Sequence, residues 1–321
     1  MTKVKLNTID NSPLKITPKY NFPPKFKLFL MLLPFLVLVI IFSYLPLYGW
    51  IYAFFDYRPG IKLTANKFVG FKWFQILLST AAQRNELIRV LKNTLGMSTL
   101  GIMLSWLPLA FAILLNELNS RKFKKFVQTA TTIPNFISWV LVYSFAFMLF
   151  SVDSGLINKI LKYLGIIQTD INFLFSDKNI WFSMIAWNTW KGLGWGAIMY
   201  MAALSSIDQE LYEAAHVDGA SRFQVIRHIT IPSLLPTYFV LLLLAIANII
   251  NNGMEQYYVF QNPMNLKKIE VLDLYVYNVG FGTSRGIPLA TAISMFKSII
   301  SVALLFFANW LSKITRKESI V

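Results

Sequence analysis

The stretch YEAAHVDGASRFQVIRHITIPSLLP, residues 212–236, is a polar insert between two segments apolar enough to cross a bilayer. The first part of the insert combines small and acidic residues at short spacing: Glu213, Ala214, Ala215, Asp218, Gly219 and Ala220. Small residues let a short helix approach a partner closely, and Gly219 tolerates a positive φ that a residue with a Cβ resists. The pattern predicts a docking element outside the membrane. An ordinary amphipathic helix and turn is the alternative.

The composition places the whole chain in a membrane. Of its 321 residues, 56% are hydrophobic and only 14% charged, and the mean hydropathy is +0.54. Soluble domains are less apolar and carry about 25% charged residues. Six apolar runs approach or exceed the roughly 20 residues that a membrane helix needs. They are residues 28–55, 94–115, 127–150, 180–204, 237–252 and 288–311. The predicted fold class is therefore an all-α membrane protein with six transmembrane helices.

The distribution of basic residues predicts the orientation of these helices. The formal charge is +15, from 30 Lys and Arg against 15 Asp and Glu. Basic clusters precede the first run, follow the second at residues 121–125, and follow the sixth at residues 313–317. Positive residues gather on the cytoplasmic side of short loops. An N-terminus in the cytoplasm places all three clusters, and the polar insert, on that side. Membrane topology thus explains the high charge without a nucleic-acid partner.

The domain organisation follows from these boundaries. We expect a cytoplasmic tail over residues 1–27, a permease domain over 28–311 that contains the coupling loop 205–236, and a cytoplasmic tail over 312–321. The first run is much longer than the apolar core of a signal peptide, so we interpret it as a retained helix. The basic external segment 56–92 is expected to lie partly flat at the membrane interface, and residues 151–177 are expected to include a short external helix.

Few charges fall inside the predicted helices. Only Lys191 and Lys297 do so, and no Asp or Glu does. A proton-coupled carrier normally needs a titratable carboxylate or histidine in the membrane. The two lysines have two open interpretations. Either they attract an acidic sugar along a translocation path, or they serve the structure by snorkelling or by pairing with backbone carbonyls between helices.

Motifs for catalysis and for cofactors are missing from the sequence. No phosphate-binding loop of the form G-x-x-x-x-G-K-[ST] occurs, and the chain has no cysteine. Its two histidines, His216 and His228, lie in the polar insert without carboxylates at metal-ligand spacing. We therefore predict no catalytic residue, no metal and no cofactor in this chain.

Polar and aromatic residues in two helices are candidates for contact with a sugar. The fourth run contributes Asn188, Trp190, Lys191 and Gly192, and the fifth contributes Asn248 and Asn252. An asparagine amide can donate to and accept from sugar hydroxyls, and an indole ring covers the apolar face of a pyranose. If both are helical, Asn248 and Asn252 share one face. Hydrogen bonding between helices is the alternative role for each residue.

The order E-A-A-x-x-D-G-A at Glu213–Ala220, followed by I-x-x-P at Ile229–Pro232, resembles the EAA loop of ABC importer permeases. Ile231 stands where leucine is usual. The segments YLPLYGWIYAFFDYRPG, residues 44–60, and FVGFKWF, residues 68–74, resemble the LplB-type branch of the carbohydrate permeases, which are similar to the maltose permease.

The resemblance implies a type I ABC importer permease fold and a place in a bacterial cytoplasmic membrane. It also implies a set of partners: a second related permease, two cytoplasmic ATPase subunits that bind ATP and Mg²⁺, and an extracellular solute-binding lipoprotein. The cargo would be an oligosaccharide or a polysaccharide fragment. In that family the helices that flank the EAA loop line the path, which favours the asparagine and glycine candidates above. A self-sufficient secondary carrier and a membrane-embedded glycan-processing enzyme are the two alternatives.

Overall fold

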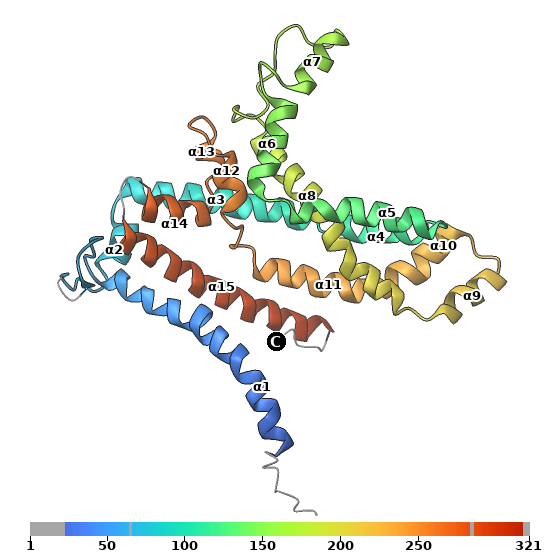
Figure 1. Ribbon diagram of the computed structural model, residues 1–321, viewed down its shortest axis with the longest axis horizontal. Helices are drawn as coiled ribbons and strands as arrows, with labels where there is room; N and C mark the ends of the chain where they lie inside the picture. Colours follow the sequence, from blue (N-terminus) through green and yellow to red (C-terminus); the bar gives the residue numbers. More distant parts are fainter. Residues whose placement is uncertain (1–22, 64–65, 283–285, 317–321) are drawn as a thin grey trace, which may run out of the picture. The chain divides into compact units, whose positions relative to one another are not determined.

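A computed structural model describes residues 23–63, 66–282 and 286–316. Most of the two predicted tails, residues 1–22 and 317–321, lies outside the described residues. The described part is helical, apart from turns and one isolated antiparallel bridge between Phe55 and Phe68 (Figure 1). This agrees with the predicted all-α class. The chain forms two compact units, residues 1–50 and 51–321, and each is described on its own.

The described part of the first unit is an apolar helix, a π-helical turn and the first residues of a 3-10 helix that continues beyond Trp50. Helix α1, Pro24–Val39, continues as the π-helical turn Ile40–Tyr44, which leads into the 3-10 helix Leu45–Phe54. Proline has no backbone N–H, so Pro34 and Pro46 interrupt regular α-helical hydrogen bonding, and π and 3-10 turns are usual near such interruptions. The described side chains of α1 are exposed. An apolar surface of this kind requires lipid or another protein against it.

The second unit begins with an amphipathic helix and a long broken helix. Helix α2 is Lys72–Ser79, α3 is Ala81–Met103 and α4 is Trp106–Asn116. Together α3 and α4 form a candidate span of 36 residues. At 1.5 Å per residue it measures about 54 Å, well above the roughly 30 Å of bilayer hydrocarbon. The α3–α4 helix is therefore longer than the hydrocarbon layer is thick. Of the external segment 56–92, the run FVGFKWFQILL, expected to lie flat at the interface, contains most of the amphipathic helix α2, and residues 81–92 belong to α3.

The predicted third helix is broken. Helix α5, Arg121–Thr132, passes into the 3-10 turn Ile133–Phe136, and α6, Trp139–Phe150, follows at an angle of 106°. Pro134 explains the change of hydrogen bonding at the break. Ser138 caps the new helix, because its hydroxyl accepts a hydrogen bond from the N–H of Leu141 at 3.4 Å. Helix α7, Leu156–Tyr163, is the short helix expected in residues 151–177.

Helix α8, Ile180–Ser205, is the central helix of this unit and packs against α4, α5 and α11. Two glycines allow the close approach of its neighbours. A Cβ on Gly194 would overlap the backbone carbonyl of Thr131 in α5, and one on Gly196 would lie 3.2 Å from Pro108 in α4. Small residues at helix contacts are typical of membrane bundles, where van der Waals packing holds helices together.

Eight further elements follow among the described residues, of which α11 and α15 overlap the predicted fifth and sixth runs. They are α9 (Gln209–Val217), α10 (Arg222–Val225), the π-helical turn Ile226–Thr230, α11 (Ile231–Ala247), α12 (Glu255–Phe260), α13 (Leu266–Ile269), α14 (Leu272–Phe281) and α15 (Ile287–Arg316). Helix α11 ends five residues before the predicted boundary at Asn252, and α15 continues past the predicted end at Leu311.

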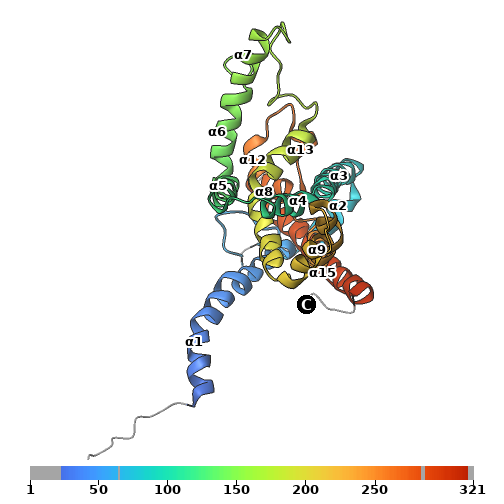
Figure 2. The same cartoon turned by 90° about the vertical axis from the view of Figure 1, so that its right-hand side faces the viewer.

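Four helices among the described residues are long and apolar enough to cross a membrane: Lys25–Phe54, Ala81–Asn116, Arg222–Ala247 and Ile287–Ile314. The bent pair Arg121–Phe136 and Trp139–Phe150 adds a fifth if it forms one span. Within the second unit, α4 continues α3 end to end, and α11 packs against both α15 and α3 (Figures 1 and 2). Helices α9 and α10 lie at one end of them, and α2 and α14 lie at the opposite end (Figure 1).

Candidate functional site

The first candidate site is the hairpin formed by the polar insert. Asp208 caps α9 by accepting a hydrogen bond from the N–H of Glu210 at 3.0 Å. At the other end, the N–H of Ala220 donates to the carbonyl of Ala215 at 2.9 Å, and the N–H of Gly219 donates to His216 at 3.1 Å. This pair of bonds is a Schellman motif, which requires a left-handed residue after the helix. Gly219 has φ +72°, as the sequence predicted.

The hairpin returns directly into a spanning helix. Ser221 and Gln224 form a capping box, in which the N–H of Ser221 donates to Gln224 Oε1 at 2.7 Å. Residues Arg222–Ala247 then form one 26-residue candidate span. The hydroxyls of Tyr212 and Thr230 lie 3.3 Å apart, which ties α9 to the start of that span.

The hairpin presents an apolar and acidic surface to its surroundings. Glu213, Ala214, Asp218 and Gly219 are exposed, and Ala215 and Ala220 are half-buried. Three large apolar side chains, which the sequence analysis did not identify, are also exposed: Leu211 at 50%, Val217 at 87% and Phe223 at 70%. An exposed apolar cluster with a charged margin is typical of a protein docking surface. The sequence could have indicated this surface, because Leu211, Val217 and Phe223 are large apolar residues within an otherwise polar loop.

The candidates on α8 have different environments. The ammonium of Lys191 donates a hydrogen bond of 2.6 Å to the carbonyl of Asn135 and lies 5.4 Å from the centre of the Trp139 ring. Asn188 is exposed, and a Cβ on Gly192 would meet nothing within 4 Å. Lys191 therefore contacts the break before α6, as expected for the structural interpretation left open above.

Trp190 belongs to an aromatic cluster on α8 and α6. Its ring stacks on Phe145, with centroids 6.2 Å apart and an interplanar angle of 18°. Trp187 meets Phe145, Phe150 and Trp190 edge to face. Such pairs stabilise packing by about 0.5–1.5 kcal/mol each. Trp190 nevertheless keeps 41% of its surface exposed, so part of it remains available to a sugar.

The structure corrects the prediction that Asn248 and Asn252 share a helix face. Helix α11 ends at Ala247, because Asn248 caps it and the chain leaves the helix in a turn. Asn248 is exposed, and its amide donates to the carbonyl of Leu244 at 2.9 Å. The amide of Asn252 instead donates to Ser98 of α3 at 2.9 Å, so it joins the loop after α11 to α3. Its Oδ1 is buried without a partner among the described residues.

An acidic residue missed by the sequence analysis lies beside this break. Asp273 of α14 forms an ion pair with Lys297 of α15, and both side chains are largely buried. The other carboxylate oxygen of Asp273 accepts a hydrogen bond from the N–H of Gly253 at 2.9 Å. The available signal was an aspartate in an apolar segment close to a lysine in the next span, since buried charges are usually paired. Lys297 is thus neutralised within the chain.

The candidates therefore form two groups. Among the described residues, no hydrogen bond joins those on α8 to those at the break after α11. In the same part of the chain, no group of three His, Asp or Glu side chains is arranged to hold a metal ion.

The sequence and the fold match known transport proteins. Residues 101–317 match the family model described as "Binding-protein-dependent transport system inner membrane component". Protein LplB of Bacillus subtilis is 38% identical, over 89% of this chain and 88% of LplB. The polygalacturonan/rhamnogalacturonan transport system permease protein YteP of Bacillus subtilis is 37% identical, over 91% of this chain and 89% of YteP.

A solved structure agrees with these relatives. A chain from the crystal structure of a bacterial ABC transporter for import of the acidic polysaccharide alginate superimposes with a TM-score of 0.79. It is 32% identical, and the match covers 91% of this chain and 96% of that chain. The described helices thus have the type I ABC permease fold, and the role is that of a transport subunit and not of an ATPase. The chain belongs to the family of binding-protein-dependent transport system inner membrane components.

Proposed function

We propose that this chain is the permease subunit of an ATP-driven importer of oligosaccharides or polysaccharide fragments, and that the α9–α10 hairpin couples it to a separate ATPase. The observation that carries the coupling role is the hairpin itself. Its turn is held by the Schellman motif at Gly219, and it exposes Leu211, Val217 and Phe223 at one end of the helices. An apolar docking face on a rigid turn transmits movement better than a flexible loop does.

Within this proposal Glu213, Ala214, Ala215, Asp218, Gly219 and Ala220 form the contact with the ATPase. The exposed residues Glu213, Ala214 and Asp218 meet the partner, while Ala215, Gly219 and Ala220 shape the turn. The hydroxyl contact between Tyr212 and Thr230 links the hairpin to α11. ATP-driven movement of the partner would reach the membrane helices along this route.

We further propose six spans with a cytoplasmic N-terminus in the bacterial cytoplasmic membrane. The bent pair α5–α6 would serve as the third span, and α8 as the fourth. Helix α8 has 26 residues, so it is about 39 Å long and able to cross the hydrocarbon. Part of its surface is covered, because α4, α5 and α11 pack against it.

The related proteins support the nature of the cargo and the partners. YteP is named for the transport of polygalacturonan and rhamnogalacturonan. The alginate transporter has been solved in complex with a periplasmic protein that holds an alginate pentasaccharide. We infer an acidic saccharide for this chain too, delivered by an external binding protein. A second related permease and two ATPase subunits would complete the assembly. Asn188, Trp190, Gly192 and Asn248 remain the candidates for the path, while Lys191 and Asn252 support the structure around it.

Substitution of Gly219 tests the coupling. Gly219→Val places a β-branched residue at φ +72°, whereas membrane insertion is unaffected because the spans are unchanged. Stimulation of ATP hydrolysis by loaded binding protein should fall at least tenfold in the reconstituted complex. Gly165→Val is the matched control, since Gly165 has φ +68° and lies after α7, outside the hairpin. Normal stimulation in Gly219→Val would contradict the coupling role.

A further inference from the structure

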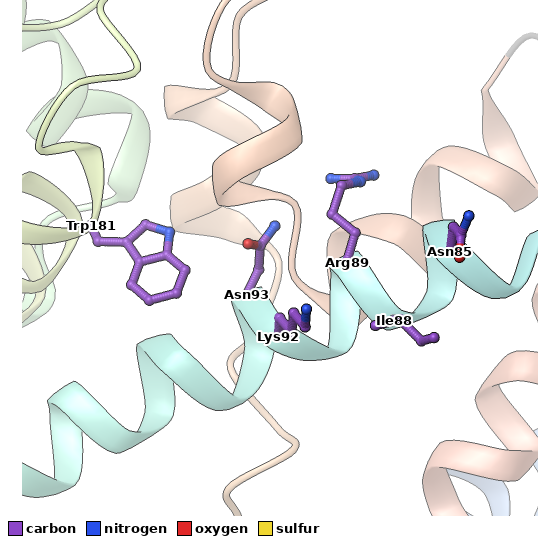
Figure 3. A pocket seen from close by; sticks show the side chains of 6 residues that line it. All are labelled: Asn85, Ile88, Arg89, Lys92, Asn93 and Trp181. Atoms are coloured by element: carbon purple, nitrogen blue, oxygen red, sulfur yellow. The ribbon is translucent and has the colours of Figure 1, made fainter. Parts of the chain in front are cut away.

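An open cavity of about 480 Å³ lies along one face of α3 (Figure 3). Its walls are formed by Asn85, Ile88, Arg89, Lys92, Asn93 and Trp181. The five residues of α3 follow each other at intervals of three, one, three and one, which places them on one face of the helix. The sixth comes from the first turn of α8. Ligand pockets usually measure about 300–1,000 Å³.

Trp181 is a fixed wall of this cavity. Its indole N–H donates to the carbonyl of Lys268 at 2.7 Å, and its ring lies against Gly96, where a Cβ would overlap it. Asn93 is also held, because its amide donates to the carbonyls of Lys267 at 3.0 Å and Glu270 at 3.1 Å. Both side chains are therefore positioned before any ligand arrives, which reduces the entropy lost on binding.

Most of the charges around the cavity are already paired. The guanidinium of Arg89 lies 2.6 Å from Glu86 and 2.6 Å from Glu270. Lys268 lies 2.8 Å from Asp177, and this ammonium holds the pKa of the Asp177 carboxyl below its usual value. Lys92 differs from these, because its exposed ammonium has no hydrogen bond or ion pair among the described residues. The exposed amide of Asn85 is likewise without a partner there.

We propose that this cavity binds a short acidic segment of the cargo on the external side, with the ring of one sugar residue beside Trp181, its carboxylate at Lys92, and a hydroxyl of the next sugar residue at Asn85. The face of the sugar ring would lie against Trp181, since an indole ring covers the apolar face of a pyranose. A free cation beside a fixed aromatic ring favours a uronate over a neutral sugar, because the ammonium forms a charge-assisted hydrogen bond only with the former.

The position of the cavity fits an early step of transport. In the proposed topology the first turns of α3 and the start of α8 face outward, and the length of α3–α4 carries those turns beyond the hydrocarbon. Inside the spans, Lys191 and Lys297 are engaged with Asn135 and Asp273. Of these lysines, Lys92 is the one with an ammonium free for an incoming carboxylate. The inference rests on the proposed import of saccharides.

Binding of trigalacturonate to the complete importer in nanodiscs tests the inference. Equilibrium dialysis without the binding protein would compare trigalacturonate with its fully methyl-esterified form. We expect the native complex to prefer the acid at least fivefold, and this preference to shrink as salt screens the exposed charge. Lys92→Gln should weaken acid binding about tenfold, Lys92→Arg should restore most of it, and Trp181→Leu should weaken both ligands. Lys159→Gln is the matched control, since Lys159 is an exposed lysine on α7.

The outcomes separate this inference from the proposed function. Equal binding of acid and ester, or unchanged binding in Lys92→Gln, would overturn the sugar site even if Gly219→Val uncouples the importer as expected. A Lys92→Gln complex that binds trigalacturonate normally but loses affinity for the external binding protein would identify the cavity as a docking surface, which also overturns the inference. Loss of ATPase stimulation in Gly219→Val should not change the binding of trigalacturonate, because equilibrium dialysis measures binding without ATP.

Discussion

The ammonium of Lys191 on α8 donates a 2.6 Å hydrogen bond to the carbonyl of Asn135, at the point where the chain turns by 106° between α5 and α6. The last carbonyls of a helix have no partner in the helix and carry partial negative charge. In a membrane each such group needs an internal partner. The ammonium of Lys191 is such a partner for the carbonyl of Asn135, and it thereby stabilises the break between α5 and α6.

Loss of this contact should weaken the bundle without abolishing insertion. Lys191→Met removes the donor and keeps much of the volume, and we expect a loss of roughly 1 kcal/mol, the usual scale for such bonds in membranes. The melting temperature of the purified complex should fall by about 2–4 °C. Lys191→Arg should remain close to the native value. An unchanged melting temperature in Lys191→Met, with a raised KM for transport, would instead assign Lys191 to the substrate.

The glycines of α8 should differ sharply in tolerance. Gly194→Ala places a methyl group against the backbone of Thr131, whereas Gly192→Ala meets nothing within 4 Å. Overpacking of this kind costs about 1–3 kcal/mol. Gly194→Ala should lower the yield of assembled complex in size-exclusion chromatography, and Gly192→Ala should not. Equal yields would mean that α5 and α8 separate easily.

The two asparagines after α11 should have separable roles. Asn252→Leu removes the hydrogen bond to Ser98, so it should destabilise the complex by about 1 kcal/mol. Among the residues that the structure describes, the Asn248 side chain bonds only within its own segment, to Leu244 and Asn251, and it is exposed. Asn248→Leu should therefore assemble normally and retain basal ATP hydrolysis. If Asn248 contacts the sugar, uptake of labelled saccharide falls several-fold in that variant. Normal uptake would remove Asn248 from the path.

The ion pair between Asp273 and Lys297 should behave as a unit. Each side chain is about one-fifth exposed or less, at 20% and 16%. Removal of one partner from a buried pair costs roughly 3 kcal/mol, because it leaves an uncompensated charge. Asp273→Asn and Lys297→Gln should each lower the melting temperature. The decrease in the double variant should be smaller than the sum of the two single decreases. Additive losses would show that the two charges act independently.

Cysteine labelling tests the six spans, because the native chain has no thiol. In intact cells an impermeant maleimide should modify Thr169→Cys and should leave Lys124→Cys and Ser221→Cys unlabelled. Thr169 and Ser221 are both exposed in the folded chain, so accessibility alone does not separate them. Both cytoplasmic positions should react after the membrane is permeabilised. Labelling of Ser221→Cys from outside would contradict the coupling hairpin.

The sequence alone was sufficient for the features that depend on local chemistry. Hydrophobicity and run length predicted an all-α membrane chain, and the EAA pattern around Glu213 and Gly219 predicted both the family and the positive φ of the turn. These signals are strong because a bilayer requires about 20 apolar residues in each helix, and because only glycine adopts that φ without strain.

Tertiary structure decided which polar residues in the membrane are engaged with each other. Lys191 bonds to Asn135, 56 positions earlier, and Lys297 pairs with Asp273, 24 positions earlier. The partner of Asn252 is Ser98, and this contact replaces the shared helix face expected with Asn248. Periodicity describes the faces of one helix, whereas these contacts depend on where helices end and which ones pack together. That information resides in the whole bundle and not in any single segment.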